Sequence, residues 1–162
     1  MIHPDLEVDP TAAVRPITSL LTGEQTVAMV MTMVGRLHSS RPVTCADVQD
    51  HRLSFLVSQQ AEWVAAIAAS QAIVHVTVSD DVHSTYVSLN GGAKVVTDAE
   101  EITRLWSPAA RAWFDGPDDP DLAVLHFDIS EGEYWDGPGG RVGRAVAMLR
   151  AAFTGDADVL GT

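Results

Sequence analysis

The segment 35–45, GRLHSSRPVTC, gathers side chains that are suited to hold an anion. It carries two arginines, a histidine and several hydroxyl groups, in a chain whose formal net charge is −12. Arg41 offers a planar fork of N–H donors that matches phosphate oxygens, Pro42 fixes the backbone beside it, and Thr44 can add a hydroxyl donor. The alternative is a solvated hairpin end whose charge prevents edge pairing. The segment alone leaves both interpretations open.

The composition limits the classes of protein to consider. With 162 residues, of which 46% are hydrophobic, the chain is expected to form one domain over residues 1–162, with a flexible N-terminus at 1–14. Ten Lys and Arg against 22 Asp and Glu argue against nucleic acid or an anionic membrane as partner. The chain has no secretory signal pattern and no apolar run of about 20 residues. We therefore expect a soluble, cytoplasmic protein.

The hydrophobic pattern predicts six short strands with a few helices between them. Strand patterns occupy residues 26–34, 41–48, 52–58, 72–79, 84–96 and 122–129, and the last one continues toward 132–136. The first strand is an uninterrupted apolar run, which predicts burial on both faces. Helices are expected at 58–70 with Ser58 as N-cap, from Thr97 with a capping box to Glu100, and at 141–153.

Two further features refine this fold. Gly91 and Gly92 within the fifth strand predict a bulge or a close backbone approach. The sequence shows no repeated alternation of strand and helix patterns, which argues against a doubly wound parallel sheet. The fold class that fits is mainly β (α+β), a small antiparallel β-barrel with short flanking helices.

Several motifs occur together in an order that resembles a known family. GRLHSSRPVT follows an apolar strand, and YVSLNGGAKVVTD, LW, WF, GPDDP and EYWD come after it in that order. This set resembles the pyridoxamine 5′-phosphate oxidase-like, FMN-binding split-barrel family, in particular its general stress protein 26 branch. The resemblance covers residues 15–136, and Val43 stands where the branch has Met.

The resemblance implies a homodimer of six-stranded split barrels with FMN at the dimer interface. It implies a flavin-dependent oxidoreductase of unknown substrate with a role in stress. The implied cofactor-binding residues are Arg41, Thr44 and Ser58 at the phosphate, Pro42 and Val43 along the ring edge, and Trp135 approaching the flavin from the partner subunit. No catalytic side chain stands out.

The sequence departs from the family pattern where a lysine usually supports the phosphate. SQQAEWV (58–64) contains no lysine, and Gln60, Ala61 and Glu62 occupy this region. Since charge-assisted contacts contribute about 1.5–3 kcal/mol each, we expect weakened FMN binding, with a deazaflavin or another anionic small molecule as alternatives. The C-terminus lacks the substrate-binding segment of true pyridoxamine-phosphate oxidases, so that activity is not expected. A non-enzymatic flavin or anion carrier and a cofactor-free dimer remain open.

The remaining chemically active side chains are expected to be structural. His38 is interpreted as an exposed turn residue, and His75, His83 and His126 have no metal-ligand spacing. We therefore predict no metal site. The single cysteine, Cys45, excludes an internal disulfide and is expected to be packed inside. Trp106 and Trp113 are interpreted as core or dimer-interface residues, and DGPDDPD (115–121) as a solvated loop.

Overall fold

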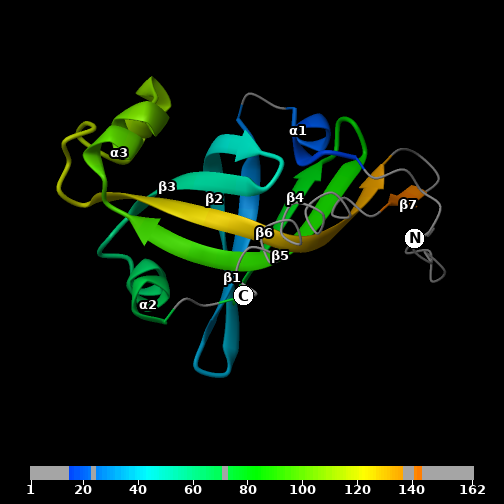
Figure 1. The fold of residues 1–162 in the computed structure, drawn as a ribbon, viewed down its shortest axis with the longest axis horizontal. Helices are drawn as coiled ribbons and strands as arrows, with labels where there is room; N and C mark the ends of the chain where they lie inside the picture. Colours follow the sequence, from blue (N-terminus) through cyan, green and yellow to red (C-terminus); the bar gives the residue numbers. More distant parts are fainter. Residues whose placement is uncertain (1–14, 23–24, 71–72, 137–140, 144–162) are drawn as a thin grey trace, which may run out of the picture.

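A closed antiparallel barrel of six strands forms the body of the molecule (Figure 1). The computed structural model describes residues 15–22, 25–70, 73–136 and 141–143. The strands are β1 Val27–Val34, β2 Leu37–Gln49, β3 Arg52–Ser58, β4 Ile73–Asp80, β5 Thr85–Val96 and β6 Leu122–Asp136. Their order is β3-β2-β1-β4-β5-β6, and pairing of β3 with β6 closes the barrel. The predicted mainly-β barrel is therefore confirmed, and a short strand β7, Arg141–Gly143, pairs with the end of β6.

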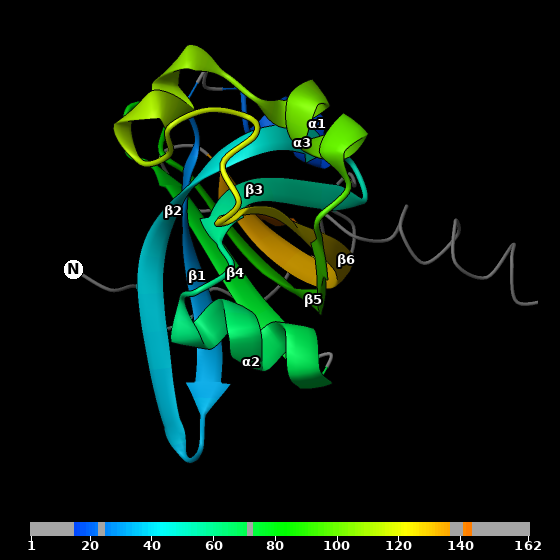
Figure 2. The ribbon, with the colours of Figure 1, turned by 90° about the vertical axis from the view of Figure 1, so that its left-hand side faces the viewer.

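Short helices lie at the periphery of the barrel. They are α1 Ile17–Leu20, α2 Glu62–Ser70, α3 Ala99–Leu105 and the 3₁₀ helix η1 Pro108–Ala112. Figure 2 shows α2 at the end of the barrel from which the β1–β2 hairpin projects, while α3 lies at the opposite end. The predicted helix at 58–70 is present but begins at Glu62. The N-cap of α3 is Asp98, which accepts the Glu101 N–H at 3.0 Å, so the predicted cap at Thr97 is wrong by one residue.

The core has two parts. Buried side chains of β1, β3, β4, β5 and β6 form the main cluster, which α1 and α2 complete with Ile17, Val64 and Ile67. β2 packs against this cluster through partly buried Val43, Cys45 and Val48. A smaller cluster lies on the outer face of β3 and β6, where Ile102 and Leu105 of α3 pack on Leu122 and Val124. The second cluster fixes α3 and the following segment above β3, which positions one wall of the site described below.

β1 corrects one expectation from the sequence. The run was predicted to be buried on both faces, but its side chains alternate: Ala28 and Val30 are fully buried, whereas Val27 is 50% and Met33 59% exposed. Alternation is the ordinary consequence of a strand in a barrel wall. The outer face of β1 is thus apolar and open in the chain as described.

The predicted bulge in β5 is confirmed. The pairing of β5 with β6 shifts register between Asn90 and Gly91. A Cβ atom at Gly91 would collide with the carbonyl oxygen of Asp128, so a side chain cannot be accommodated there.

Predictions at the chain ends are tested only in part. Residues 141–143 form β7 instead of the first turn of the helix expected at 141–153, and the rest of that helix lies outside the described residues, as does 1–14. In the described part of the chain, no helix is long and apolar enough to cross a membrane.

Candidate ligand-binding site

The candidate site arises where β2 and β3 separate. Their pairing runs from Gln49↔Arg52 to Cys45↔Phe55, with a register shift between Cys45 and Asp47. β3 is paired with β6 along its whole length, and beyond Phe55 it has no pairing with β2; the residues of β2 before Cys45 pair only with β1. The two strands therefore diverge and leave a gap in the barrel wall beside residues 42–46.

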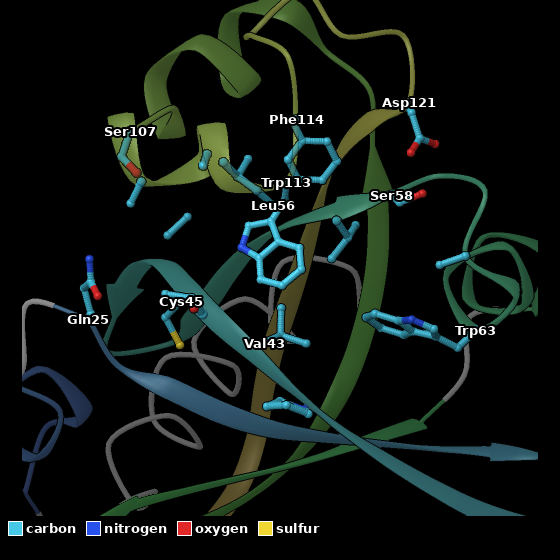
Figure 3. Close-up of a pocket in the computed structure, with 17 residues that line it drawn as sticks. Gln25, Val43, Cys45, Leu56, Ser58, Trp63, Ser107, Trp113, Phe114 and Asp121 are labelled. Atoms are coloured by element: carbon cyan, nitrogen blue, oxygen red, sulfur yellow. The ribbon is translucent and has the colours of Figure 1, made fainter.

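A cavity of about 680 Å³ occupies this gap (Figure 3). Its volume lies in the range of sites for cofactors and other small molecules. Its lining comes from β2, β3, the start of α2 and the segment around η1: Gln25, Pro42, Val43, Thr44, Cys45, Ala46, Leu56, Val57, Ser58, Ala61, Trp63, Ser107, Ala109, Ala110, Trp113, Phe114 and Asp121.

Aromatic side chains form the walls of the cavity. Figure 3 shows the indole of Trp113 between Phe114 and Val43, with Trp63 approaching from α2. Trp113 is 83% exposed, which is unusual for a side chain that buries so much apolar area when it is covered. Phe114 and Trp63 are partly buried against the two cores. The walls are suited to a flat, apolar ring system.

The main chain of β2 supplies polar groups to the same cavity. The Cys45 N–H donates to the Thr26 carbonyl at 2.8 Å, so the main-chain groups of Cys45 face β1. Because these groups alternate in an antiparallel pair, those of Thr44 and Pro42 face away from β1. The pairing of Cys45 with Phe55 uses the Thr44 C=O, which leaves the Thr44 N–H and the Pro42 C=O beside the gap. Pro42 and Thr44 are exposed, so these two groups are accessible to a ligand edge that carries a donor and an acceptor.

The structure brings four of the six predicted site residues together. Pro42, Val43, Thr44 and Ser58 all line the cavity, whereas Arg41 and Trp135 do not.

Arg41 lies on the face of β2 opposite to Thr44. Its Nη1 donates to Thr32 Oγ1 at 2.9 Å, and its guanidinium lies over the Trp63 ring, 4.6 Å from the ring centre. Partial burial lowers its pKa from the ordinary value. Strand alternation separates the side chains of Arg41 and Thr44, and of the two only Thr44 lines this cavity. An anion seat that includes Arg41 therefore stays a prediction.

Trp135 lies near the far end of β6, opposite Tyr86 of β5. Tyr86 is 40% exposed on the outer surface of the barrel, and directly paired residues share a face of the sheet. Trp135 therefore lies on the outer face, remote from the cavity of its own chain.

The end of the cavity at Ser58 is acidic. The Gln60 N–H lies 3.2 Å from Ser58 Oγ and 3.1 Å from Asp121 Oδ1, and both oxygens accept from it. Among the described lining residues, Asp121 is the only one with a formal charge. The flavin ring implied by the family resemblance fits the aromatic walls, but this end offers a phosphate no cation.

Cys45 also lines the cavity, with its sulfur drawn in Figure 3. It is half-buried and packs against the main core, in agreement with its expected place inside the protein. Burial raises the pKa of its thiol to about 12. The thiol is therefore protonated at neutral pH and is a poor nucleophile.

A network of hydrogen bonds and ion pairs lies outside the cavity, between α3 and the strands beneath it. Ser54 Oγ lies 2.9 Å from His126 Nδ1, and His126 Nε2 lies 3.2 Å from Glu101 Oε1. Arg104 bonds both oxygens of Glu101 and reaches Asp47. The pKa of His126 is lowered by burial and by Arg52, against the opposing effect of Glu101 and Asp128. The order Ser–His–Glu resembles a hydrolytic triad, but Ser54 is only 1% exposed and cannot reach a substrate.

The other histidines are also placed by the structure. His75 bonds Asn90 at 2.8 Å, His83 bonds Asp80 at 2.7 Å, and His38 is exposed on β2. Over the described ranges, no group of three or more potential ligating side chains could hold a metal ion.

Sequence reasoning missed most of the cavity wall. Of the two places predicted for Trp113, core or dimer interface, the core is wrong, because Trp113 is exposed and lines the cavity; the interface stays a prediction. Trp106 packs against the smaller core as expected. Asp121 was assigned to a solvated loop. The signal that could have found both is the cluster of two adjacent aromatic residues followed by a short loop that leads directly into β6.

Comparison with known proteins gives these features a context. The family model described as "Pyridoxamine 5'-phosphate oxidase like" matches residues 12–158. General stress protein 26 of Bacillus subtilis (strain 168) is 36% identical over 58 residues, which are 34% of this chain and 41% of that protein. The match thus spans less than half of the curated relative.

Solved structures share the fold. General stress protein 26 from Bacillus anthracis str. Sterne has a TM-score of 0.65 and 19% identity, covering 73% of this chain and 89% of that one. A general stress FMN/FAD binding protein from Xanthomonas citri has a TM-score of 0.65 and 24% identity, covering 74% and 86%. At these identities the likeness establishes the fold alone.

Proposed function

We propose that this chain, which belongs to the pyridoxamine 5′-phosphate oxidase-like family, binds a flavin-type ring in the gap between β2 and β3 and acts as a flavin-dependent oxidoreductase. The observation that carries the proposal is the aromatic-walled cavity at the point where β2 and β3 diverge, beside the Thr44 N–H and the Pro42 C=O. An isoalloxazine has broad faces that pack on aromatic side chains and one polar edge that bonds to main-chain groups. The Xanthomonas citri neighbour is described as binding FMN or FAD, which supports the same class of ligand.

The described residues would have distinct tasks in this site. Trp113 and Trp63 would flank the ring and exclude water from it, and the Thr44 main chain would bond its polar edge. Ser58 would meet the polar tail. A bound flavin would supply the electron-transfer chemistry, while the protein orients it. FMN and a deazaflavin are the cofactors that the sequence implies, and the names of the relatives support a role in stress.

The proposed assembly is a homodimer formed through the outer face of β1. Val27 and Met29 are 50% and 40% exposed there, together with Met33. Trp135 lies on the outer surface of the same sheet, from which it could reach the cavity of a second copy. Light scattering of the eluting protein should give twice the chain mass. Met29→Glu should shift it toward the mass of one chain, because a charge would be buried in the interface.

A second candidate, a non-enzymatic flavin carrier, is favoured by the scarcity of acid–base groups. Within the described lining, Asp121 is the only ionised side chain, and the Cys45 thiol is held protonated. Oxidation of reduced nicotinamide in the presence of flavin would separate the two candidates, since a carrier leaves the nicotinamide unchanged.

The experiment that tests ligand binding is a titration of the full chain with FMN and riboflavin, followed by flavin fluorescence and visible absorption. The proposal predicts quenching of the flavin by the neighbouring indoles and a shifted absorption band. If neither flavin changes its spectrum at protein concentrations up to about 100 μM, an affinity range typical of weak cofactor sites, the proposed function is wrong.

A further inference from the structure

The Ser58 end of the cavity carries a carboxylate that the surrounding turn holds in place. Asp121 is held there by the β3–α2 turn: its carbonyl accepts the Gln59 N–H at 2.8 Å, and its carboxylate accepts the Gln60 N–H at 3.1 Å. Its own N–H donates to Asp119 Oδ1 at 2.9 Å. Two main-chain bonds therefore hold Asp121 in place, and a third bond orients its carboxylate.

The Asp121 carboxylate already bonds the N–H group that an anionic tail would use. The N–H groups that precede a helix are the usual place for a phosphate, but here the Gln60 N–H already bonds Asp121 and Ser58. Glu62, in the first turn of α2, is exposed and adds a second carboxylate to the segment that follows Ser58. The Oδ2 atom of Asp121 has no hydrogen-bond donor among the described residues and can accept from a ligand hydroxyl.

Arg41 does not offset this negative charge. Its guanidinium donates to Thr32 and stacks on Trp63, and it lies outside the cavity lining. Moving it to a phosphate would break both contacts. At the Ser58 end of the cavity, where the proposed function places the tail, the described lining therefore offers hydroxyl groups and a carboxylate, without a cation.

We infer that the cavity selects flavins with an uncharged, hydroxyl-bearing tail, of which riboflavin is the simplest, over flavins that end in a phosphate. The inference rests on the proposed function, because it requires that a flavin ring occupies the gap. A phosphate with a charge near −2 faces repulsion from Asp121 and loses the solvation of its charge without a paired cation. A ribityl hydroxyl can instead donate to the carboxylate in a charge-assisted hydrogen bond.

The test compares dissociation constants for riboflavin and FMN by flavin fluorescence at low ionic strength. We expect riboflavin to bind at least about tenfold more tightly than FMN, the size of effect that one unfavourable charge contact gives. High salt should narrow the difference by improving FMN binding, because screening acts on the charged ligand.

Two variants identify the source of the preference. Asp121→Asn should bring FMN to within about threefold of riboflavin, since the repulsion disappears. Asp118→Asn, a matched change in the same loop at an exposed residue outside the cavity, should leave the ratio unchanged. Circular dichroism checks that both variants fold. If Asp121→Asn does not fold, the salt series on the unmodified protein still tests whether charge repulsion weakens FMN binding.

The outcomes separate the inference from the proposed function. If both flavins bind and FMN binds as tightly as riboflavin or more tightly, the selection for uncharged tails is wrong and the proposed function survives. If riboflavin is preferred but neither salt nor Asp121→Asn changes the ratio, the role given to Asp121 is wrong. If neither flavin binds, the proposed function itself is overturned.

Discussion

Ser54 and Leu56 lie two residues apart on the same face of β3, yet they belong to two regions with opposite chemistry. Ser54 begins a chain of hydrogen bonds that runs through His126 and Glu101 to Arg104. Leu56 lines the cavity, where most lining side chains are apolar or aromatic and Asp121 is the one charged residue of the described lining. The residues that look most catalytic are thus bonded to one another, and the open surface is made of residues that look structural.

The difference follows from what covers each region. α3 packs over Ser54 and His126, so their polar atoms must find partners within the protein. Neutral His126 satisfies both neighbours in a single tautomer, donating from Nε2 to Glu101 and accepting from Ser54 at Nδ1. Beside the cavity the strands diverge, and the aromatic side chains stay accessible. The accessible aromatic side chains beside the diverging strands therefore indicate the ligand site, and the covered polar network does not.

The largest expected effect sharpens the cavity side of this comparison. Trp113→Ala should weaken riboflavin binding by about 2 kcal/mol, or roughly 30-fold, as truncation of an aromatic residue central to a binding site typically does. Thermal stability should stay unchanged, because the indole is 83% exposed. Fluorescence titration measures the riboflavin affinity, and melting curves measure the thermal stability. Val82→Ala, at another exposed apolar residue outside the cavity, serves as the control. Unchanged riboflavin binding in Trp113→Ala would show that Trp113 does not contact the ligand.

The next effect concerns the network beneath α3. Ser54→Ala leaves His126 Nδ1 buried without a donor, which should lower the free energy of unfolding by about 1.5 kcal/mol. Flavin affinity should remain within about twofold, since Ser54 lies outside the cavity lining. Chemical denaturation gives the stability, with Ser79→Ala at an exposed position of β4 as the matched control. If Ser54→Ala lost flavin binding but kept its stability, the network beneath α3 would be part of the binding site, which contradicts the separation of the two regions.

Much of the fold follows from local sequence patterns. β3 was predicted with its observed bounds because its apolar residues alternate between polar breaks, and the bulge at Gly91 because two glycines interrupt a strand. The exposed face of β1 was not predicted, because burial depends on what packs on the strand and not on its own composition. The shift of the α3 cap from Thr97 to Asp98 is a choice between adjacent capping residues that only the tertiary packing of α3 decides.

The site was predicted less completely than the fold. The approximate location on β2 came from the family motif, and Thr44 and Ser58 do line the cavity. The Arg41–Trp63 stack joins a strand to a helix, and the Asp121–Gln60 bond joins two loops. Such contacts between segments distant in sequence depend on how the barrel closes, which residue spacing does not encode.

A third prediction tests the network by pH. The folded pKa of His126 is lowered below its ordinary value of 6.5, chiefly by burial and then by Arg52. The unfolded chain therefore binds a proton more readily, so the contribution of His126 is complete above pH 6.5 and is lost as pH falls toward the lowered value. His126→Gln should flatten this part of the stability curve from pH 5 to 8, whereas the exposed His38→Gln should not. An equally steep curve in His126→Gln would assign the effect to other groups.

The smallest effect concerns the thiol in the cavity. With a pKa of about 12, Cys45 is thiolate in only about one molecule in 10⁵ at pH 7. Iodoacetamide should therefore label the folded protein far more slowly than the denatured protein, as measured by intact mass. Rapid labelling of the folded chain at pH 7 would show that the thiol is activated and would reopen a nucleophilic role.

The measurement that tests the central claim most directly is hydrogen–deuterium exchange of the full chain with and without saturating riboflavin. The account predicts slower exchange in residues 42–46 and 107–114, which border the cavity, with the Thr44 N–H among the protected amides. Exchange in α3 at Ala99–Leu105 should stay unchanged. Protection confined to α3 and the strands beneath it, with none at 42–46, would contradict the assignment of the gap between β2 and β3 as the ligand site.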